Sequence, residues 1–151
     1  MIFEDIKDFL NVCPSGRLLG LDVGTKRIGV AITDDTRKIC LPSDTIIRQG
    51  NKKDFVVLAN LCKSKNIKGI VVGLPISFKE KDTECSLFIK KFTENLSKEI
   101  NLPIIFQDER LSSFEAEELM LDEIGSNKTK KVVDKIAASY ILESFLNCFL
   151  N

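Results

Sequence analysis

The stretch LLGLDVGTKRIGVAITD, residues 18–34, has the apolar composition of buried strands but carries a carboxylate at Asp22. Apolar residues take successive positions across 17–24, which is typical of a strand buried on both faces. A second apolar run covers 28–34, and the short gap between the two runs predicts an antiparallel hairpin. A buried carboxylate is costly unless a metal, a cation or hydrogen bonds compensate it. Asp22 therefore needs a partner.

Outward from this hairpin, apolar runs alternate with segments of helical periodicity. Strands separated by helices pair in parallel through right-handed crossovers. We therefore expect an α/β protein with a mixed five-stranded sheet, antiparallel over the first three strands and parallel for the last two, flanked by helices. This layout resembles the ribonuclease H-like fold. The remaining strands are expected at 39–47, 68–75 and 102–110, and the helices at 3–11, 52–65, 83–100, from Ser112 or Ser113 to Leu121, and 132–150.

The chain has 151 residues, the size of one ordinary domain, and shows no internal repeat or Pro/Gly-rich linker. We expect a single domain over 1–151. Its apolar runs have the length of strands and fall short of the ~20 residues that cross a bilayer. The N-terminus lacks the basic-then-apolar order of a signal peptide. We expect a cytoplasmic protein without a membrane segment.

The residues available for chemistry are restricted, because the chain has five scattered cysteines and no histidine. The absence of a C-x-x-C pair and of histidine argues against zinc, and the odd number of cysteines argues against a disulfide framework. We expect reduced, mostly buried thiols. Imidazole bases are excluded, so acid–base or metal chemistry must use carboxylates.

The formal net charge is zero, but the charges are unevenly distributed. Four lysines and one aspartate fall within 126–135, which is expected to begin as a loop, whereas 115–123 is strongly acidic. Such asymmetry permits a local anion-binding face on a neutral protein. Lysine runs are also common in solvated loops.

Asp134 is a second misplaced acid. On the final helix it shares one face with Ala138, Ile141 and Phe145, at i+4, i+7 and i+11. It therefore lies at the end of the buried stripe. An alternative is a first-turn acid favoured by the helix dipole. For Asp22, the corresponding alternative is a strand-end aspartate that accepts from turn amides.

The pair Asp108–Glu109 ends the last predicted strand, and its two side chains point to opposite faces. The flanking residues do not show which of the two faces Asp22. A solvated strand end paired with Arg110 is the alternative. If one acid of the pair meets Asp22 and Asp134, the three form a hard oxygen site suited to Mg²⁺ or Mn²⁺. Such a site favours two-metal phosphodiester hydrolysis.

Four motifs resemble the YqgF/RuvX family: LLGLDVGTKRIGVAITD, VVGLP, DERLSS with Glu115-Ala116, and KKVVDKIAASYILES. The similarity spans about residues 17–146. It implies a ribonuclease H-like fold related to the RuvC resolvase, and nuclease activity on pre-16S rRNA or on Holliday junctions. The family's acidic triad corresponds to Asp22, Glu109 and Asp134. Its basic positions, expected to contact phosphate, are Lys26, Arg27, Arg110, Lys128, Lys130 and Lys131.

One departure concerns the fourth acid that RuvC-type and ribonuclease H enzymes usually place at the end of the fourth strand. Here that strand ends in Gly73-Leu74-Pro75-Ile76, without a carboxylate. The second metal ion is therefore expected to bind weakly, or only with substrate phosphate present. Cleavage would then be slow or substrate-dependent.

Several functions remain open from the sequence. The favoured partner is precursor rRNA, within pre-ribosomal particles, and junction DNA is the alternative. A junction resolvase would act as a homodimer, whereas a monomer favours RNA processing. A non-catalytic assembly factor would keep the fold without cleavage. The hairpin motif is also similar to the phosphate-binding hairpin of actin-like, heat-shock and sugar-kinase ATPases, which need a second lobe and a second glycine-rich loop.

Overall fold

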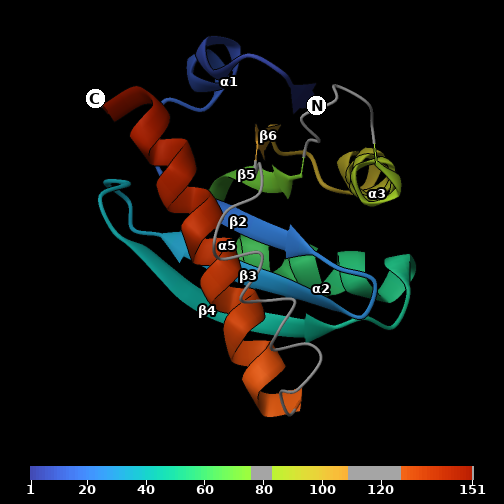
Figure 1. Cartoon of the computed structure of the whole chain (residues 1–151). Helices are drawn as coiled ribbons and strands as arrows, with labels where there is room; N and C mark the ends of the chain where they lie inside the picture. The colour runs from blue at the N-terminus through green and yellow to red at the C-terminus, as the bar shows by residue number, and fades with distance from the viewer. Residues whose placement is uncertain (76–82, 109–126, 151) are drawn as a thin grey trace.

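The computed structural model describes residues 1–75, 83–108 and 127–150 of the chain (Figure 1). Helices and strands alternate after an N-terminal antiparallel meander. The elements, in chain order, are β1 (Ile2–Phe3), α1 (Ile6–Val12), β2 (Arg17–Val23), β3 (Arg27–Thr33), β4 (Cys40–Ile47), α2 (Asn51–Ser64), β5 (Ile67–Leu74), α3 (Glu84–Glu99), β6 (Ile104–Asp108) and α5 (Asn127–Leu150).

The described strands form one six-stranded sheet in the order β1-β6-β5-β2-β3-β4. β3 pairs antiparallel with both β2 and β4, as the hairpin pattern predicts. β5 pairs parallel with β2, and β6 pairs parallel with β5. β4 is an edge strand, and its pairing with β3 shifts register near Pro42, which has no backbone N–H to donate to the sheet. The mixed α/β sheet is confirmed.

The sheet has a helical layer on each face. Phe55 and Leu58 of α2 and Phe92 of α3 belong to one buried cluster, together with the odd-numbered residues of β2 from Leu19 to Val23. Phe9 of α1 and the apolar residues of α5 belong to a second cluster. Figure 1 shows α5 crossing in front of β2, β3 and β4, with α2 behind the sheet. The two faces are called the α5 face and the α2/α3 face below.

The N-terminus corrects the expected strand number from five to six. β1 pairs parallel with β6, through Ile2 opposite Ile104 and Phe3 opposite Ile105. The helix expected at 3–11 begins later, at Ile6, where Asp5 accepts the amide of Lys7 as the N-cap. Two residues are too few to show an apolar pattern, so this strand can be recognised only from its pairing with β6.

The prediction of a loop at the start of the lysine-rich segment is wrong, because α5 begins at Asn127 rather than near 132. Lysine is a good helix former, and no glycine or proline interrupts 127–150. Lys130 and Lys131 are therefore helical residues and not loop residues. The helix expected from Ser112 or Ser113 to Leu121 lies outside the described residues.

All five cysteines are free thiols, as expected, but two of them are exposed. Burial raises the pKa of Cys40 and of Cys62 to about 11. Burial also raises the pKa of Cys13, although the Arg37 charge opposes that effect.

Because their pKa values are raised, these three buried or half-buried thiols are almost wholly protonated near neutral pH. The thiolate is the reactive form of cysteine, so they should react slowly. In a thiol titration with Ellman's reagent on the folded protein, we expect Cys85 and Cys148 to react rapidly. Cys13, Cys40 and Cys62 are expected to react only after denaturant is added. Rapid reaction of all five thiols without denaturant would contradict this burial pattern.

No helix within the described ranges combines the length and hydropathy of a membrane-spanning segment.

Candidate active site

Asp22 lies on the α5 face of the sheet. Leu19 and Leu21 of β2 belong to the cluster under α2 and α3, whereas Leu18 belongs to the cluster under α5. Successive strand residues face opposite sides, so Asp22 shares the side of Leu18 and Gly20. A Cβ added at Gly20 would lie 2.5 Å from the Leu142 side chain of α5, which confirms this side.

Gly29 brings Asp134 over this part of the sheet. It is the antiparallel partner of Asp22 in the β2–β3 pairing, so the two Cα atoms lie about 5 Å apart. A Cβ added at Gly29 would lie 1.9 Å from the carbonyl oxygen of Asp134. The helix backbone therefore rests directly on this glycine. Asp134 therefore lies over the strand partner of Asp22, although 112 positions separate the two acids in the sequence.

Asp134 is buried, with 8% of its surface exposed, and has a cationic partner. Nε of Arg27 donates to Oδ2 of Asp134 at 2.6 Å, which is a charge-assisted hydrogen bond. Arg27 precedes Gly29 by two residues, so alternation places both on the α5 face. Arg27 was predicted to bind nucleic acid; in the structure its guanidinium compensates the buried carboxylate.

The helix-dipole alternative for Asp134 does not fit the described geometry, and the turn-amide alternative for Asp22 stays a prediction. Asp134 lies seven residues after the first residue of α5, so it is not a first-turn acid stabilised by the helix dipole. At the β2–β3 turn, the amide of Gly24 donates to the carbonyl oxygen of Arg27 at 2.9 Å. The Gly24 amide therefore has a backbone partner within the turn.

β6 shows which face of the sheet Asp108 occupies. Asp108 is the parallel partner of Leu74, which belongs to the cluster on the α2/α3 face. Gln107 lies on the other side, where its Nε2 lies 3.9 Å from Sγ of Cys148 on α5. Asp108 therefore faces away from Asp22, and Glu109 lies outside the described residues.

The structure describes only some of the other predicted site residues. Lys26 is exposed in the hairpin turn, and Lys130 and Lys131 lie on α5 ahead of Asp134. Glu109 and Arg110 lie outside the described residues, as does the side chain of Lys128. Within 1–75, 83–108 and 127–150, no three acids or cysteines gather closely enough to hold a metal. Of the predicted triad, the structure brings together Asp22 and Asp134.

The sequence reasoning missed the role of Gly29. A glycine inside an otherwise apolar strand often marks a close backbone approach, and that signal was present in the hairpin. It could not identify α5 as the approaching element. The fourth strand, now β5, ends at Leu74, and no carboxylate occurs in its last residues.

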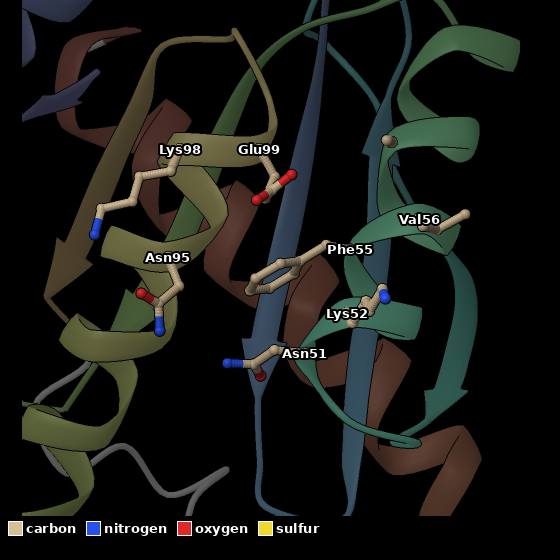
Figure 2. Close-up of a pocket in the computed structure, with 8 residues that line it drawn as sticks. Asn51, Lys52, Phe55, Val56, Asn95, Lys98 and Glu99 are labelled. Atoms are coloured by element: carbon tan, nitrogen blue, oxygen red, sulfur yellow. The ribbon is translucent and has the colours of Figure 1, made fainter.

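A groove between α2 and α3 is lined at its base by Phe55, Val56 and Ala59 of α2, with Asn95 and Lys98 across from them on α3. Figure 2 shows the Phe55 ring pointing from α2 toward α3. Both helices pack on the sheet face opposite to α5. The groove therefore cannot take part in a site built on Asp22 and Asp134.

A sequence model of RuvX, described as Holliday junction resolvase, matches residues 16–148. The chain belongs to the RuvX family. Proteins similar to this RuvX chain carry the name "Putative pre-16S rRNA nuclease". One from Cereibacter sphaeroides is 40% identical over 97% of this chain and 93% of that protein. One from Mycoplasma mobile is 42% identical over 87% and 92%, and one from Rickettsia peacockii is 34% identical over 100% and 99%.

Two solved resolvases share the fold of this RuvX chain. Thermus thermophilus RuvC, solved with a Holliday junction substrate, has a TM-score of 0.54 at 12% identity, over 88% of this chain and 95% of that chain. The fowlpox virus resolvase, also solved with junction DNA, has a TM-score of 0.52 at 13% identity, over 89% and 99%. The expected ribonuclease H-like fold is confirmed. Family membership makes the chain a nuclease, a hydrolase that acts on nucleic acids.

Proposed function

We propose that this RuvX protein is a metal-dependent endonuclease that processes the 5′ end of pre-16S rRNA during ribosome biogenesis. The observation that carries the proposal is the placement of Asp134 over Gly29, the strand partner of Asp22. Two acids from distant parts of the chain are thereby gathered on one face of the sheet. The names of the similar proteins supply the rRNA substrate.

The donor set fits a hard divalent cation. Asp22 and Asp134 offer carboxylate oxygens, and the chain contains no histidine to favour zinc or copper. Arg27 already shows that a positive charge is stabilised beside Asp134. Asp22, Glu109 and Asp134 would hold Mg²⁺ or Mn²⁺. Bound there, the ions would activate a water and stabilise the leaving oxygen of the phosphodiester.

The protein's own residues orient the acids and the substrate. The apolar flanks of β2 fix the backbone of Asp22, and the contact of α5 with Gly29 fixes that of Asp134. Arg27 holds the Asp134 carboxylate in one orientation. Lys26, Arg110, Lys128, Lys130 and Lys131 would contact the phosphates of the strand, with further donors of the Arg27 guanidinium. Because β5 supplies no fourth acid, we propose that a second ion binds weakly in the absence of substrate.

We expect Asp108 and Glu109 to face opposite sides of the sheet, which gives a matched pair of variants. Glu109→Gln is expected to slow cleavage about a hundredfold, because a ligand of one ion is lost. Asp108→Asn is expected to stay within about twofold of the parent rate, because its side chain is exposed on the other face. Single-turnover cleavage rates measure both. A larger loss in Asp108→Asn than in Glu109→Gln would show that the assignment is reversed.

The substrate is tested with two nucleic acids in parallel. A precursor 16S rRNA carrying its 5′ leader and a four-way DNA junction are each incubated with Mg²⁺, with Mn²⁺ and with EDTA. We expect cleavage of the RNA at its 5′ leader with either metal and none with EDTA. Absence of RNA cleavage under all conditions, with intact folded protein, would contradict the proposal.

Junction resolution is the second candidate function, because the family description is Holliday junction resolvase. Resolvases cut two strands symmetrically, which needs two copies of the site. Preferential cleavage of the junction by a homodimer would favour this function. Cleavage of the rRNA leader by a monomer, or by the chain bound to pre-ribosomal particles, would favour RNA maturation.

A further inference from the structure

Arg48 contacts both ends of the hairpin turn that joins β2 to β3. Its backbone amide donates to the carbonyl oxygen of Lys26 at 3.0 Å. Its Nη1 lies 3.4 Å from the carbonyl oxygen of Gly24. Arg48 directly follows β4, whose last residue, Ile47, pairs with Arg27. One residue thus contacts the start and the end of the turn that presents Lys26.

The guanidinium of Arg48 is itself immobilised by several groups. Its Nε donates to Oδ2 of Asp54 at 3.0 Å, and Nη2 donates to Oδ1 of Asn51. The rings of Phe88 and Phe92 on α3 lie 5.7 Å and 5.0 Å from its Cζ, within the range of cation–π contact. The guanidinium is therefore held by α2 and α3 at the same time.

Asp54 is a rigid anchor for this arginine. It is only 2% exposed, and its second oxygen accepts the backbone amide of Gln49 at 3.0 Å. It also lies in the first turn of α2, where the helix dipole favours an acid. Buried ion pairs of this kind add little net stability, because desolvation offsets their attraction. The fixed geometry of the pair between Arg48 and Asp54 therefore matters more here than its contribution to stability.

We propose that Arg48 is a positioning residue for nucleic-acid binding: it fixes the β2–β3 turn so that Lys26 and Arg27 keep their places. This inference rests on the proposed function only in assigning phosphate contact to those two residues. Arg48 lies on the far side of the turn and acts through it. Loss of the guanidinium releases the Gly24 carbonyl and the anchor to α2 and α3, and the turn becomes free to move.

Arg37 provides a matched control. It is buried, with 6% of its surface exposed, and like Arg48 it donates to backbone carbonyls, those of Gly16 at 2.7 Å and Cys13 at 3.0 Å. It follows β3 at the opposite end of that strand from Arg27. Loss of either guanidinium leaves buried acceptors unpaired. Only Arg48 contacts the turn that presents Lys26.

The test compares Arg48→Gln with Arg37→Gln in two measurements. Hydrogen–deuterium exchange over residues 22–29 reports the turn, and fluorescence anisotropy with a short labelled single-stranded RNA in EDTA reports binding without cleavage. For Arg48→Gln we expect turn amides to exchange about tenfold faster and RNA to bind about tenfold more weakly. For Arg37→Gln we expect parent values of both, with a lower unfolding temperature.

A cycle with Lys26→Gln separates positioning from a direct effect of charge. If Arg48 acts through the turn, Lys26→Gln weakens RNA binding less in the Arg48→Gln background than in the parent. Arg48→Lys keeps the charge but lacks the planar fork, so it is expected to loosen the turn as well. If Arg48→Gln does not fold, the same measurements are made on Arg48→Lys.

The proposal is overturned if the turn exchanges at the parent rate without the Arg48 guanidinium, or if RNA binding stays unchanged while the turn loosens. Equal effects from Arg37→Gln would also overturn it, because they would indicate a general structural role. Failure of the parent protein to cleave RNA contradicts the proposed function alone. It leaves the exchange and binding measurements, and hence the role of Arg48, to be decided separately.

Discussion

Asp22→Asn is expected to reduce phosphodiester cleavage by about a thousandfold, a loss of about 4 kcal/mol of transition-state stabilisation. Asp22 would serve both ions, whereas Glu109 and Asp134 would each serve one, so its loss should have the largest catalytic effect. Asparagine has the same shape but no charge. The fold should therefore persist, since the neutral side chain removes a partly buried charge from the α5 face.

Two measurements check this result: the single-turnover cleavage rate and the affinity for Mn²⁺ by titration calorimetry. The control is Asp44→Asn on β4, because Asp44 is exposed and its Oδ1 accepts the Thr45 amide, a bond that asparagine can also make. We expect parent-like cleavage and Mn²⁺ binding for the control. Equal cleavage by Asp22→Asn and the parent protein would disprove the catalytic role.

Gly29→Ala is expected to destabilise the protein by about 3 kcal/mol, at the upper end of the usual cost of overpacking a core. The new methyl group would lie 1.9 Å from the carbonyl oxygen of Asp134 and 2.4 Å from its carbonyl carbon. These are backbone atoms of α5, so no change of side-chain rotamer relieves the clash. The helix must move away from β3, which also separates Asp134 from Asp22.

Urea denaturation measures the free energy of unfolding, and Gly69→Ala is the matched control. There the added Cβ would lie 2.8 Å from Cζ of Phe9 and 2.9 Å from Sγ of Cys13, which are side-chain atoms that can shift. We expect the control to lose less stability and to keep its cleavage rate. If Gly29→Ala were as stable as Gly69→Ala, the close docking of α5 on β3 would be wrong.

Local patterns predicted most of the elements to within a few residues. The hairpin strands, α2, β5 and α3 each have a clear apolar period, and the structure places them at or close to the predicted bounds. The buried stripe of α5 was also predicted: Ala138, Ile141 and Phe145 are all in the core. Tyr140 of the same helix is 40% exposed and lies outside this stripe.

Other features depended on neighbours that no local pattern reveals. β1 exists only because β6 lies beside it. Neither acid of the Asp108–Glu109 pair could be assigned to a face from the sequence, and the pairing of β6 with β5 then placed Asp108 on the α2/α3 face. Arg27 was assigned to nucleic acid on its motif, and its bond to Asp134 spans 107 positions of sequence. Each outcome depends on strand register or helix docking.

The sequence by itself determined the chemistry and the building blocks of this protein. A chain without histidine leaves hard-ion chemistry to carboxylates, and apolar periodicity is a local property that any short window reveals. The tertiary structure alone decided which groups meet: Asp134 with Arg27 over Gly29, and Arg48 with the turn. The physical reason is that side-chain direction alternates along a strand, so a shift of one residue in pairing would exchange the two faces.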